Sequence, residues 1–286
     1  MAAVGIVLGL TAALVYGASD FLGGAASKRV SAAWVLLVSQ STGLVLTVLV
    51  VLSDTRSHPS VAALRAGAVA GVLGVAALGL LYTALAIGPM VVIAPMAAVM
   101  GALVPFTWGL LRGERLSGPS VAGVVLAVVA VVLVSLHPRD ETAAEPVTPR
   151  RFPLGVPLAV VAGITLGVVA VLVADTRSAT GMWPLVAWRC ASLPLVAGAV
   201  LVLRPMPRPD RRILLIGAGV GLLEVVGNAS FIVAARHGLL ALVGVLASLY
   251  PVSTVVLARI RYQERLVRLQ LFGLVLAVTG IALIAA

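Results

Sequence analysis

The chain has 286 residues, of which 61% are hydrophobic and only 10% are charged, and its mean hydropathy is +1.17. A soluble domain contains about 25% charged residues, so this composition excludes a soluble globular enzyme or binding domain and indicates a membrane protein. The formal net charge is +10, but the 20 basic residues are mostly dispersed at the ends of apolar runs with few aromatic residues between them. This pattern favours contact with lipid headgroups over binding of nucleic acid.

Ten apolar runs follow one another along the chain, each near the roughly 20 residues that a bilayer-spanning helix needs. The first five are Val4–Ala26, Ala33–Leu52, Ala66–Ile87, Met90–Leu111 and Val121–Leu136. The second five are Leu154–Ala174, Trp183–Leu203, Ile213–Ala235, Leu239–Ile260 and Leu266–Ala286. The first run lacks a preceding basic segment and a cleavage motif, so we expect a first span and not a signal peptide. The sequence therefore predicts an all-α polytopic membrane protein with ten transmembrane helices.

The two groups of five runs are related by an internal repeat. At a shift of 150 residues, Glu114-Arg115-Leu116 falls on Glu264-Arg265-Leu266, and Gly88 falls on Gly238. Because five is odd, consecutive five-helix units enter the membrane in opposite directions. We therefore predict two inverted five-helix repeats, residues 1–136 and 152–286, joined by a polar linker at residues 137–151.

Three features of the sequence carry a resemblance to a known family. They are the segment Tyr16–Gly24 in the first run, the pair Gly88-Pro89, and the Glu-Arg-Leu signature near the end of each half. Together they resemble the drug/metabolite transporter superfamily, specifically its ten-span EamA-type members, over nearly the whole chain. The resemblance implies a secondary transporter, often an exporter, of small organic metabolites or drugs. One departure is that a basic residue often found in the second span of each repeat is Arg189 in the second half but Gln40 in the first.

The resemblance also implies a multi-pass protein of the cell membrane with both termini in the cytoplasm. Basic residues in the first half mildly favour this orientation, because four arginines lie in its cytoplasmic loops against two basic residues in its first outer loop. In the second half, the arginine-rich loops after the seventh and ninth runs would lie outside, which opposes the positive-inside rule. We keep cytoplasmic termini as the prediction.

Glu224 is an ionisable residue at the middle of the run Ile213–Ala235. A charged residue at that depth costs about 2.5–3.5 kcal/mol on insertion scales, so we expect it to face the protein interior or a wet cavity. Asn228 is four residues further on and shares its helical face. Gly217 and Gly221 on that face would let another helix approach closely. We predict that Glu224 and Asn228 lie on the substrate or proton pathway; the alternative for Glu224 is a structural carboxyl paired with Arg189.

Arg189 lies about seven residues into its run, and a guanidinium at that depth needs an anionic partner. Glu224, Asp20, or a carboxylate or phosphate of the substrate could be that partner, so a structural ion pair and a substrate clamp both remain open. Gln40 in the second run could hydrogen-bond a ligand or a neighbouring helix. Tyr16 and Asp20 share a face of the first run, and Asp20 could serve the pathway or simply be hydrated near the end of the run.

In the ninth run, Tyr250 and Ser253 share a face and could line the cavity, and Pro251 permits bending there because proline has no N–H. At the ends of the fourth and ninth runs, we expect each Glu-Arg pair, Glu114-Arg115 and Glu264-Arg265, to pair internally and fix the helix boundary. We expect a central cavity lined by spans one to four and six to nine. Spans five and ten would be peripheral, where a homodimer contact could form.

The polar residues offer no cofactor or metal site. The only cysteine is Cys190, the three histidines are far apart in sequence, and the motifs HExxH and GxxxxGK[ST] do not occur. We therefore expect a non-enzymatic secondary transporter whose partners are a small-molecule substrate, the lipid bilayer and possible protons. Two other classes stay open: an integral membrane lipid-modifying enzyme, which would need clustered His, Asp or Ser at the membrane surface, and a non-transporting scaffold or sensor, which would not need a mid-bilayer carboxylate.

Overall fold

The computed structural model describes residues 2–27, 30–87, 90–135, 152–176, 178–202, 209–262 and 268–285. These residues are helical throughout apart from short turns, and they contain no strand. The predicted linker at residues 137–151, the pair Gly88-Pro89 and the signature Glu264-Arg265-Leu266 lie outside the described residues.

The helices of the first half follow the predicted runs closely. They are α1 (Ala2–Ser27), α2 (Ala32–Ser53), α3 (Val61–Ile87), α4 (Met90–Leu111) and α5 (Gly118–Ser135). The largest difference is that α3 begins before Ala66. Its start is stabilised by Ser60, whose Oγ accepts a hydrogen bond from the backbone N–H of Ala63 at 3.2 Å, as an N-cap residue does.

The described part of the second half contains one α-helix more than the runs predicted, and in addition one short 3-10 helix. Its helices are α6 (Phe152–Ala174), the short 3-10 helix η1 (Ser178–Thr180), α7 (Trp183–Val202), α8 (Arg211–His237), α9 (Leu240–Ala247), α10 (Tyr250–Tyr262) and α11 (Arg268–Ala285). The N-terminus of α8 is capped by Asp210, which accepts a hydrogen bond from Ile213 N–H at 2.7 Å.

The ninth run is not the continuous helix that the sequence predicted, because it divides into α9 and α10 at residues 248–249. Pro251 has no N–H to donate to the carbonyl of Ala247 four residues earlier, so the α-helical pattern stops there. The chain crosses the gap with tighter bonds, from Leu249 N–H to Leu246 O at 3.2 Å and from Val252 N–H to Leu249 O at 2.9 Å. These bonds span three residues, as in a 3-10 turn.

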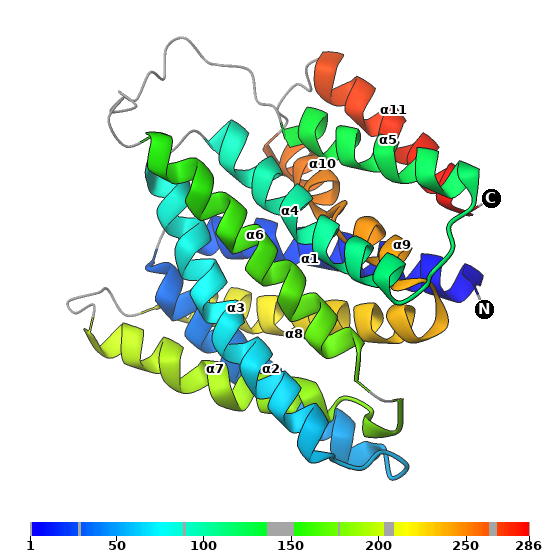
Figure 1. The fold of residues 1–286 in the computed structure, drawn as a ribbon. Helices are drawn as coiled ribbons and strands as arrows, with labels where there is room; N and C mark the ends of the chain where they lie inside the picture. Colours follow the sequence, from blue (N-terminus) through cyan, green and yellow to red (C-terminus); the bar gives the residue numbers. More distant parts are fainter. Residues whose placement is uncertain are drawn as a thin grey trace, which may run out of the picture.

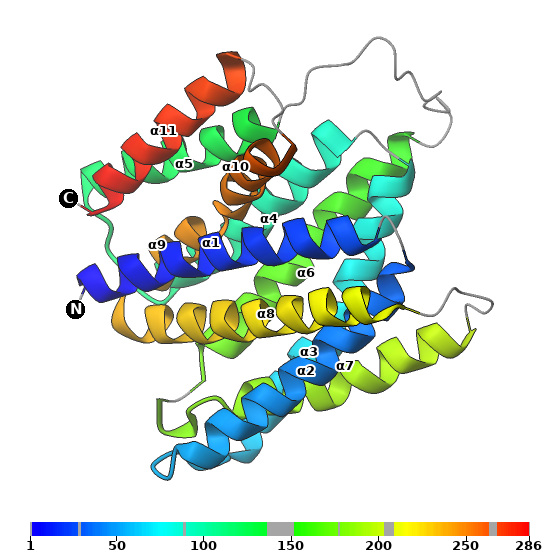
Figure 2. The ribbon, with the colours of Figure 1, turned by 180° about the vertical axis from the view of Figure 1, so that it is seen from behind.

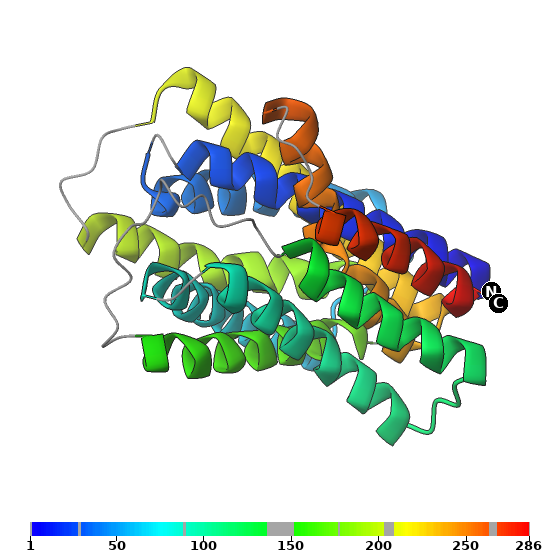
Figure 3. The ribbon, with the colours of Figure 1, turned by 90° about the horizontal axis from the view of Figure 1, so that it is seen from above.

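The two halves pack in corresponding ways. α1 packs against α8, and α6, its counterpart in the second half, packs against α3; likewise α2 packs against α8, and α7 against α3. α5 and α11 pack on each other at the periphery of the bundle and run in opposite directions (Figures 1 and 2). The free ends of α1 and α11 lie at the same end of the molecule (Figures 1 and 3).

The surface of the bundle is apolar, as a surface in contact with lipid requires. Six helices in the described part of the chain are long and apolar enough to cross a bilayer, and four further apolar segments are shorter. Large apolar residues such as Val7 (61% exposed) and Leu14 (62%) face outward, whereas the buried core is rich in alanine and valine. Bulky residues face outward because lipid tails are as apolar as leucine, so burying such residues gains little. The helices associate instead through close packing of small residues.

Glycines provide that close packing between α3 and α7. A Cβ atom at Gly67 would lie 2.0 Å from the carbonyl oxygen of Pro184, and one at Gly71 would lie 2.4 Å from that of Trp188. Both distances are shorter than any side chain can tolerate, so only glycine permits this approach of the two helices. The approach holds the segment around Trp188 and Arg189 against the first half of the chain.

Candidate functional site

A cavity of about 310 Å³ lies between the two halves of the chain. Residues of α1 to α4 and α6 to α10 line it, whereas α5 and α11 contribute none. Most of its wall is apolar, and a group of eleven lining residues is polar or aromatic. This group consists of Tyr16, Ser19, Asp20, Gln40, Trp188, Arg189, Glu224, Asn228, Phe231, Ser248 and Tyr250. The structure thus brings seven of the eight residues singled out from the sequence to one cavity.

Arg189 is the centre of the polar group. Its Nη1 donates to Oε2 of Glu224 at 2.8 Å and to Oε1 of Gln40 at 2.6 Å. The same Gln40 oxygen accepts a second hydrogen bond from Oγ of Ser192 at 3.0 Å. The Arg189 side chain is 3% exposed and that of Glu224 is 23% exposed. The guanidinium therefore has a hydrogen-bond acceptor in each half of the chain, and its charged partner Glu224 is the more exposed member of the pair.

The helices around this network approach closely because of glycines. A Cβ atom at Gly43 on α2 would lie 3.0 Å from Cζ of Arg189, so this position leaves room for the guanidinium. A Cβ atom at Gly221 on α8 would lie 2.5 Å from the carbonyl oxygen of Ser39 on α2. The glycine face predicted on the Glu224 helix therefore does receive another helix, which is α2. This contact brings Gln40 of α2 next to the Arg189–Glu224 pair.

Tyr16 and Asn228 form a second link across the cavity. The Tyr16 hydroxyl donates to Oδ1 of Asn228 at 2.7 Å, which joins α1 to α8. The Tyr16 ring lies over Gly227, where a Cβ atom would be 2.6 Å from the ring carbon Cε1. Glycine before Asn228 is thus a steric requirement of this link.

Asp20 lines the same cavity one helical turn beyond Tyr16 and is exposed there. Within the described residues, no hydrogen bond or salt bridge to its carboxylate is present. Asp20 therefore differs from Glu224, whose charge is paired with Arg189. It is a carboxylate that a ligand entering the cavity can reach.

Ser253 is the one predicted site residue that the structure does not place in the cavity wall. Its side chain is buried between α1 and α10, where Oγ donates to the carbonyl oxygen of Ala13 at 3.0 Å and to that of Tyr250 at 2.8 Å. A Cβ atom at Gly17 would overlap this hydroxyl. Ser253 thus joins two helices, while Tyr250, from the same face of α10, does line the cavity.

Trp188, Phe231, Ser248 and Ser192 are part of the site or its network but were not predicted from the sequence. Trp188 precedes Arg189 and packs on Gly74 of α3, where a Cβ atom would be 3.4 Å from its ring. Ser248 lies at the break between α9 and α10. The proline at position 251 signals such a break, whereas nothing in the sequence near Phe231 or Ser192 distinguishes them from ordinary packing residues.

The expected pairing of Glu114 with Arg115 is wrong. The carboxylate of Glu114 instead accepts the backbone N–H groups of Leu240 and Ala241, at 2.8 and 2.9 Å. These groups belong to the first turn of α9, where N–H groups have no partner within the helix. A carboxylate at a helix N-terminus is also favoured by the helix dipole. Glu114 therefore connects the end of α4 in the first half to α9 in the second.

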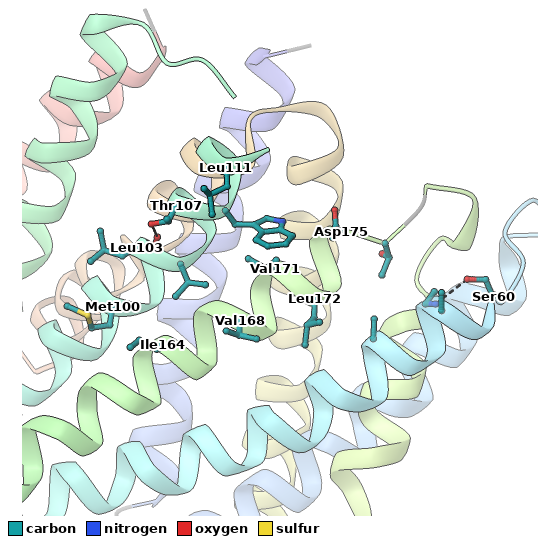
Figure 4. Close-up of a pocket in the computed structure, with 16 residues that line it drawn as sticks. Ser60, Met100, Leu103, Thr107, Leu111, Ile164, Val168, Val171, Leu172 and Asp175 are labelled. Atoms are coloured by element: carbon teal, nitrogen blue, oxygen red, sulfur yellow. Dashed lines mark hydrogen bonds between the residues drawn. The ribbon is translucent and has the colours of Figure 1, made fainter. Parts of the chain in front are cut away.

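A second, larger cavity of about 1090 Å³ lies between α3, α4 and α6 (Figure 4). Met100, Leu103 and Leu111 of α4 and Ile164, Val168 and Leu172 of α6 line it, so its wall is mostly apolar. None of the polar group around Arg189 belongs to it. In the described part of the chain, no cluster of His, Cys, Asp or Glu residues suitable for a metal ion is present in either cavity.

Comparisons with known proteins agree with this architecture. The EamA-like transporter family matches residues 3–136 and again residues 153–286. A solved structure described only as a crystal structure of a protein is similar in fold, with a TM-score of 0.78 and 19% sequence identity over 99% of this chain and 96% of that chain. No curated protein matches the chain.

The family matches cover nearly the whole chain and repeat once within it, as the internal repeat predicted. They also agree with the resemblance that the sequence carries. The chain is a multi-pass membrane protein and belongs to the EamA-like transporter family, whose members transport small molecules.

Proposed function

We propose that the protein is a proton-coupled secondary transporter that exports small organic solutes, with an amine-bearing solute as its substrate. The observation that carries the proposal is the polar group in the cavity between the two halves, in which Gln40 of the first half and Glu224 of the second share the guanidinium of Arg189. A transporter needs a solute site at the contact between its two repeats, so that movement of one against the other changes access to it.

The proposed membrane arrangement is ten spans in two inverted repeats, residues 1–136 and 152–286, in which α9 and α10 together form one broken span. The corresponding packing of the two halves and the antiparallel pair of α5 and α11 support it. A broken span next to a solute site has a physical use, since unwound backbone lines a polar cavity without exposing unpaired groups to lipid.

Close packing on the side where α1 begins and α11 ends supports alternating access. There, a Cβ atom at Gly5 would be 2.9 Å from Cα of Gly238, and one at Gly9 would be 3.3 Å from Cβ of Leu246. Glu114 adds hydrogen bonds to the first turn of α9 on the same side. Asp20, near the other end of α1, is exposed and lines the cavity. We interpret this arrangement as closed on the side of the termini and open on the opposite side.

The charges of the cavity support an amine as substrate. Two carboxylates, Asp20 and Glu224, and one guanidinium, Arg189, line it, so a cation in the cavity meets an excess of negative charge. Asp20 offers an accessible acceptor for an ammonium group, and the aromatic side chains of Trp188 and Phe231 can cover an apolar body. A solute ammonium group in the cavity and a proton on Glu224 compete for the negative charge of the two carboxylates, and their exchange couples export to proton entry.

We propose the cell membrane as the location, with both termini in the cytoplasm, so that the cavity opens outward. Single cysteines introduced at exposed Val4 near the start of α1 and at exposed Leu52 near the end of α2 in a Cys190→Ser background would test this orientation with membrane-impermeant maleimide. Labelling of both sites from outside intact cells would contradict the orientation without contradicting transport.

Purified protein in liposomes with an internal pH-sensitive dye tests the function. We expect an amine solute to drive proton movement in liposomes that contain the protein, and Glu224→Gln to abolish this movement. Solute-independent chemistry on added phospholipid would instead indicate a membrane enzyme. Neither flux nor chemistry across a broad set of organic amines and acids would favour a scaffold or sensor.

A homodimer through α5 and α11 stays a prediction. The outer faces of these helices carry exposed residues, including Val125, Val129, Phe272 and Val278, that either lipid or a second copy would cover. The mass of the protein in nanodiscs distinguishes the two occupants.

A further inference from the structure

The cavity between α3, α4 and α6 opens toward the bilayer. Its lining includes Leu103, Leu111 and Ile164, which are exposed on the lipid-facing surface of the bundle. α3 and α4 each pack on α6 but have few contacts with each other, so a groove remains between them. On the α3 side the lining residues are small, namely Ala62, Ala63 and Ala66, which explains the width of the groove.

The groove has the length of one leaflet and a polar end. Ile164 on α6 and Asp175, which directly follows α6, line its two ends, and the eleven residue steps from one to the other correspond to about 16 Å of helix. The hydrocarbon of one leaflet is about 15 Å deep, half of the roughly 30 Å core. Ser60, Thr107, Trp108, Asp175 and Thr176 provide the polar lining. In Figure 4, Ser60 and Asp175 lie toward the end of the groove away from Ile164.

The polar end carries one charge of each sign. Asp175 forms an ion pair with Arg112, and the guanidinium of Arg112 lies 5.1 Å from the centre of the Trp108 ring. The side chains of Arg112 and Asp175 are 56% and 44% exposed, so both charges remain accessible. Tryptophan and arginine at this depth are typical of the membrane interface.

We propose that this groove binds one phospholipid of the adjoining leaflet, with an acyl chain along α6 and a zwitterionic phosphate–ammonium headgroup at Arg112 and Asp175. The guanidinium of Arg112 donates to the phosphate, and the lipid ammonium donates to the carboxylate of Asp175. An exposed ion pair is weak on its own, so Arg112 and Asp175 can each take the complementary lipid charge without loss of a strong contact. A primary ammonium has N–H donors that a choline group lacks, so phosphatidylethanolamine is favoured over phosphatidylcholine. Phosphatidylglycerol has no cation for Asp175.

The wall between the groove and the central cavity explains why a lipid there stays separate from the transported solute. α4 and α6 meet at glycines: a Cβ atom at Gly163 would lie 2.4 Å from the carbonyl oxygen of Ala97, and one at Gly167 would lie 2.8 Å from that of Gly101. The Val104 side chain of α4 also lies against Gly167, where a Cβ atom would be 2.5 Å from Cβ of Val104, so no space remains for an acyl chain to pass. The lipid therefore supports the outer side of α4 and α6 while the polar group around Arg189 lies on their inner side.

Native mass spectrometry of the protein released from nanodiscs tests the proposal, with phosphatidylethanolamine, phosphatidylcholine and phosphatidylglycerol of identical acyl chains as probes. We expect wild-type protein to retain one phosphatidylethanolamine in preference to the other two. Asp175→Asn should lower the ratio of retained phosphatidylethanolamine to phosphatidylcholine by about two- to fivefold, the range that an exposed charge pair supplies. Arg112→Gln should weaken retention of all three lipids.

A steric variant tests the position of the acyl chain. Ala62→Trp places a large side chain into the groove from an exposed position on α3 and should remove the retained lipid. Val72→Trp, at another exposed position of α3 that lines neither cavity, is the matched control and should retain it. Equal retention of the three lipids by wild type, or lipid retention by Ala62→Trp equal to that of Val72→Trp, would overturn the proposal. A mass that shows a second copy of the chain in place of the lipid would also overturn the proposal. If Ala62→Trp fails to fold, the Asp175→Asn ratio decides alone.

Discussion

Arg189 and Glu224 form an ion pair of unequal burial, with 2.8 Å between Nη1 and Oε2 and side-chain exposures of 3% and 23%. Burial of the guanidinium requires a permanent acceptor, which Gln40 supplies from the other half of the chain. The carboxylate is accessible from the cavity. If one member of the pair exchanges its partner for a proton or a solute during transport, that member is Glu224.

We predict that Glu224→Gln keeps the protein folded but removes coupling to protons. The amide still accepts a hydrogen bond from Arg189, and Gln40 remains in place, so expression is retained. The amide of glutamine cannot take up or release a proton. Removal of a positioned proton-transfer group lowers the rate by about 10²- to 10⁴-fold. Flux in proteoliposomes with and without a pH gradient measures this effect. Proton-driven flux at the wild-type rate in the variant would contradict it, and retained exchange of labelled for unlabelled solute is the control for binding.

Exchange of the two charges in Arg189→Glu with Glu224→Arg separates an ion pair from a solute clamp. Each single change leaves two like charges together, so we expect both to lower the unfolding temperature strongly. The double variant restores opposite charges and should recover much of that stability. It should not recover transport, because the accessible carboxylate is replaced by a guanidinium. Recovery of transport together with stability would show that the pair is structural only.

The link between Tyr16 and Asn228 should appear as a coupling energy. Tyr16→Phe and Asn228→Leu each remove the 2.7 Å hydrogen bond. In a double-mutant cycle of the free energy of unfolding, we expect a coupling of about 0.5–1.5 kcal/mol. Ser41→Ala is a suitable control with Tyr16→Phe, since among the described residues the Ser41 hydroxyl bonds only to the carbonyl oxygen of Leu37 in its own helix. A coupling for Tyr16 and Asn228 no larger than that of the control pair would show that the bond does not form in the bilayer.

Two glycines of α3 provide a matched test of helix packing. A Cβ atom at Gly71 would lie 2.4 Å from the carbonyl oxygen of Trp188, whereas at Gly79 no described atom beyond the adjoining residues and the local helix backbone lies within 4 Å of the Cβ position. Gly71→Ala should force α3 and α7 apart and destabilise the protein by about 1–3 kcal/mol. Gly79→Ala should be neutral or stabilising by up to about 1 kcal/mol, as alanine favours the helix. Unfolding temperatures in detergent compare the two variants, and equal values would contradict the packing described here.

Glu114 should control access from the side of the termini. Glu114→Ala removes both hydrogen bonds to the first turn of α9 and, by analogy with helix caps, costs about 0.5–2 kcal/mol. If the bonds form only in the closed arrangement, the population accessible from that side rises by about two- to thirtyfold. The reporter is maleimide labelling of Ser248→Cys in a Cys190→Ser background. Arg115→Ala, which changes the exposed neighbour, is the control and should leave labelling unchanged. Equal labelling in Glu114→Ala and Arg115→Ala would remove Glu114 from the closure.

The amino-acid sequence by itself determined the helical class, the position of nearly every helix and the membership of the family. These are local properties: about 20 apolar residues suffice to define a span, and the repeat is visible as a fixed spacing of Glu-Arg-Leu and glycine. It also indicated that Glu224 faces the protein interior, because the bilayer penalises any other position of a charge.

The tertiary structure decided which polar groups meet. Arg189 is paired with both Glu224 and Gln40, Tyr16 with Asn228, and Glu114 with the start of α9, and the members of these pairs are 35 to 212 residues apart. The hydropathy pattern and the helical repeat specify which residues share a face of one helix. They do not specify how that helix is rotated against its neighbours. That rotation is set by close contacts at glycines such as Gly71 and Gly221. At Gly17 such a contact with Ser253 joins α1 to α10, while Tyr250, on the same face as Ser253, lines the cavity.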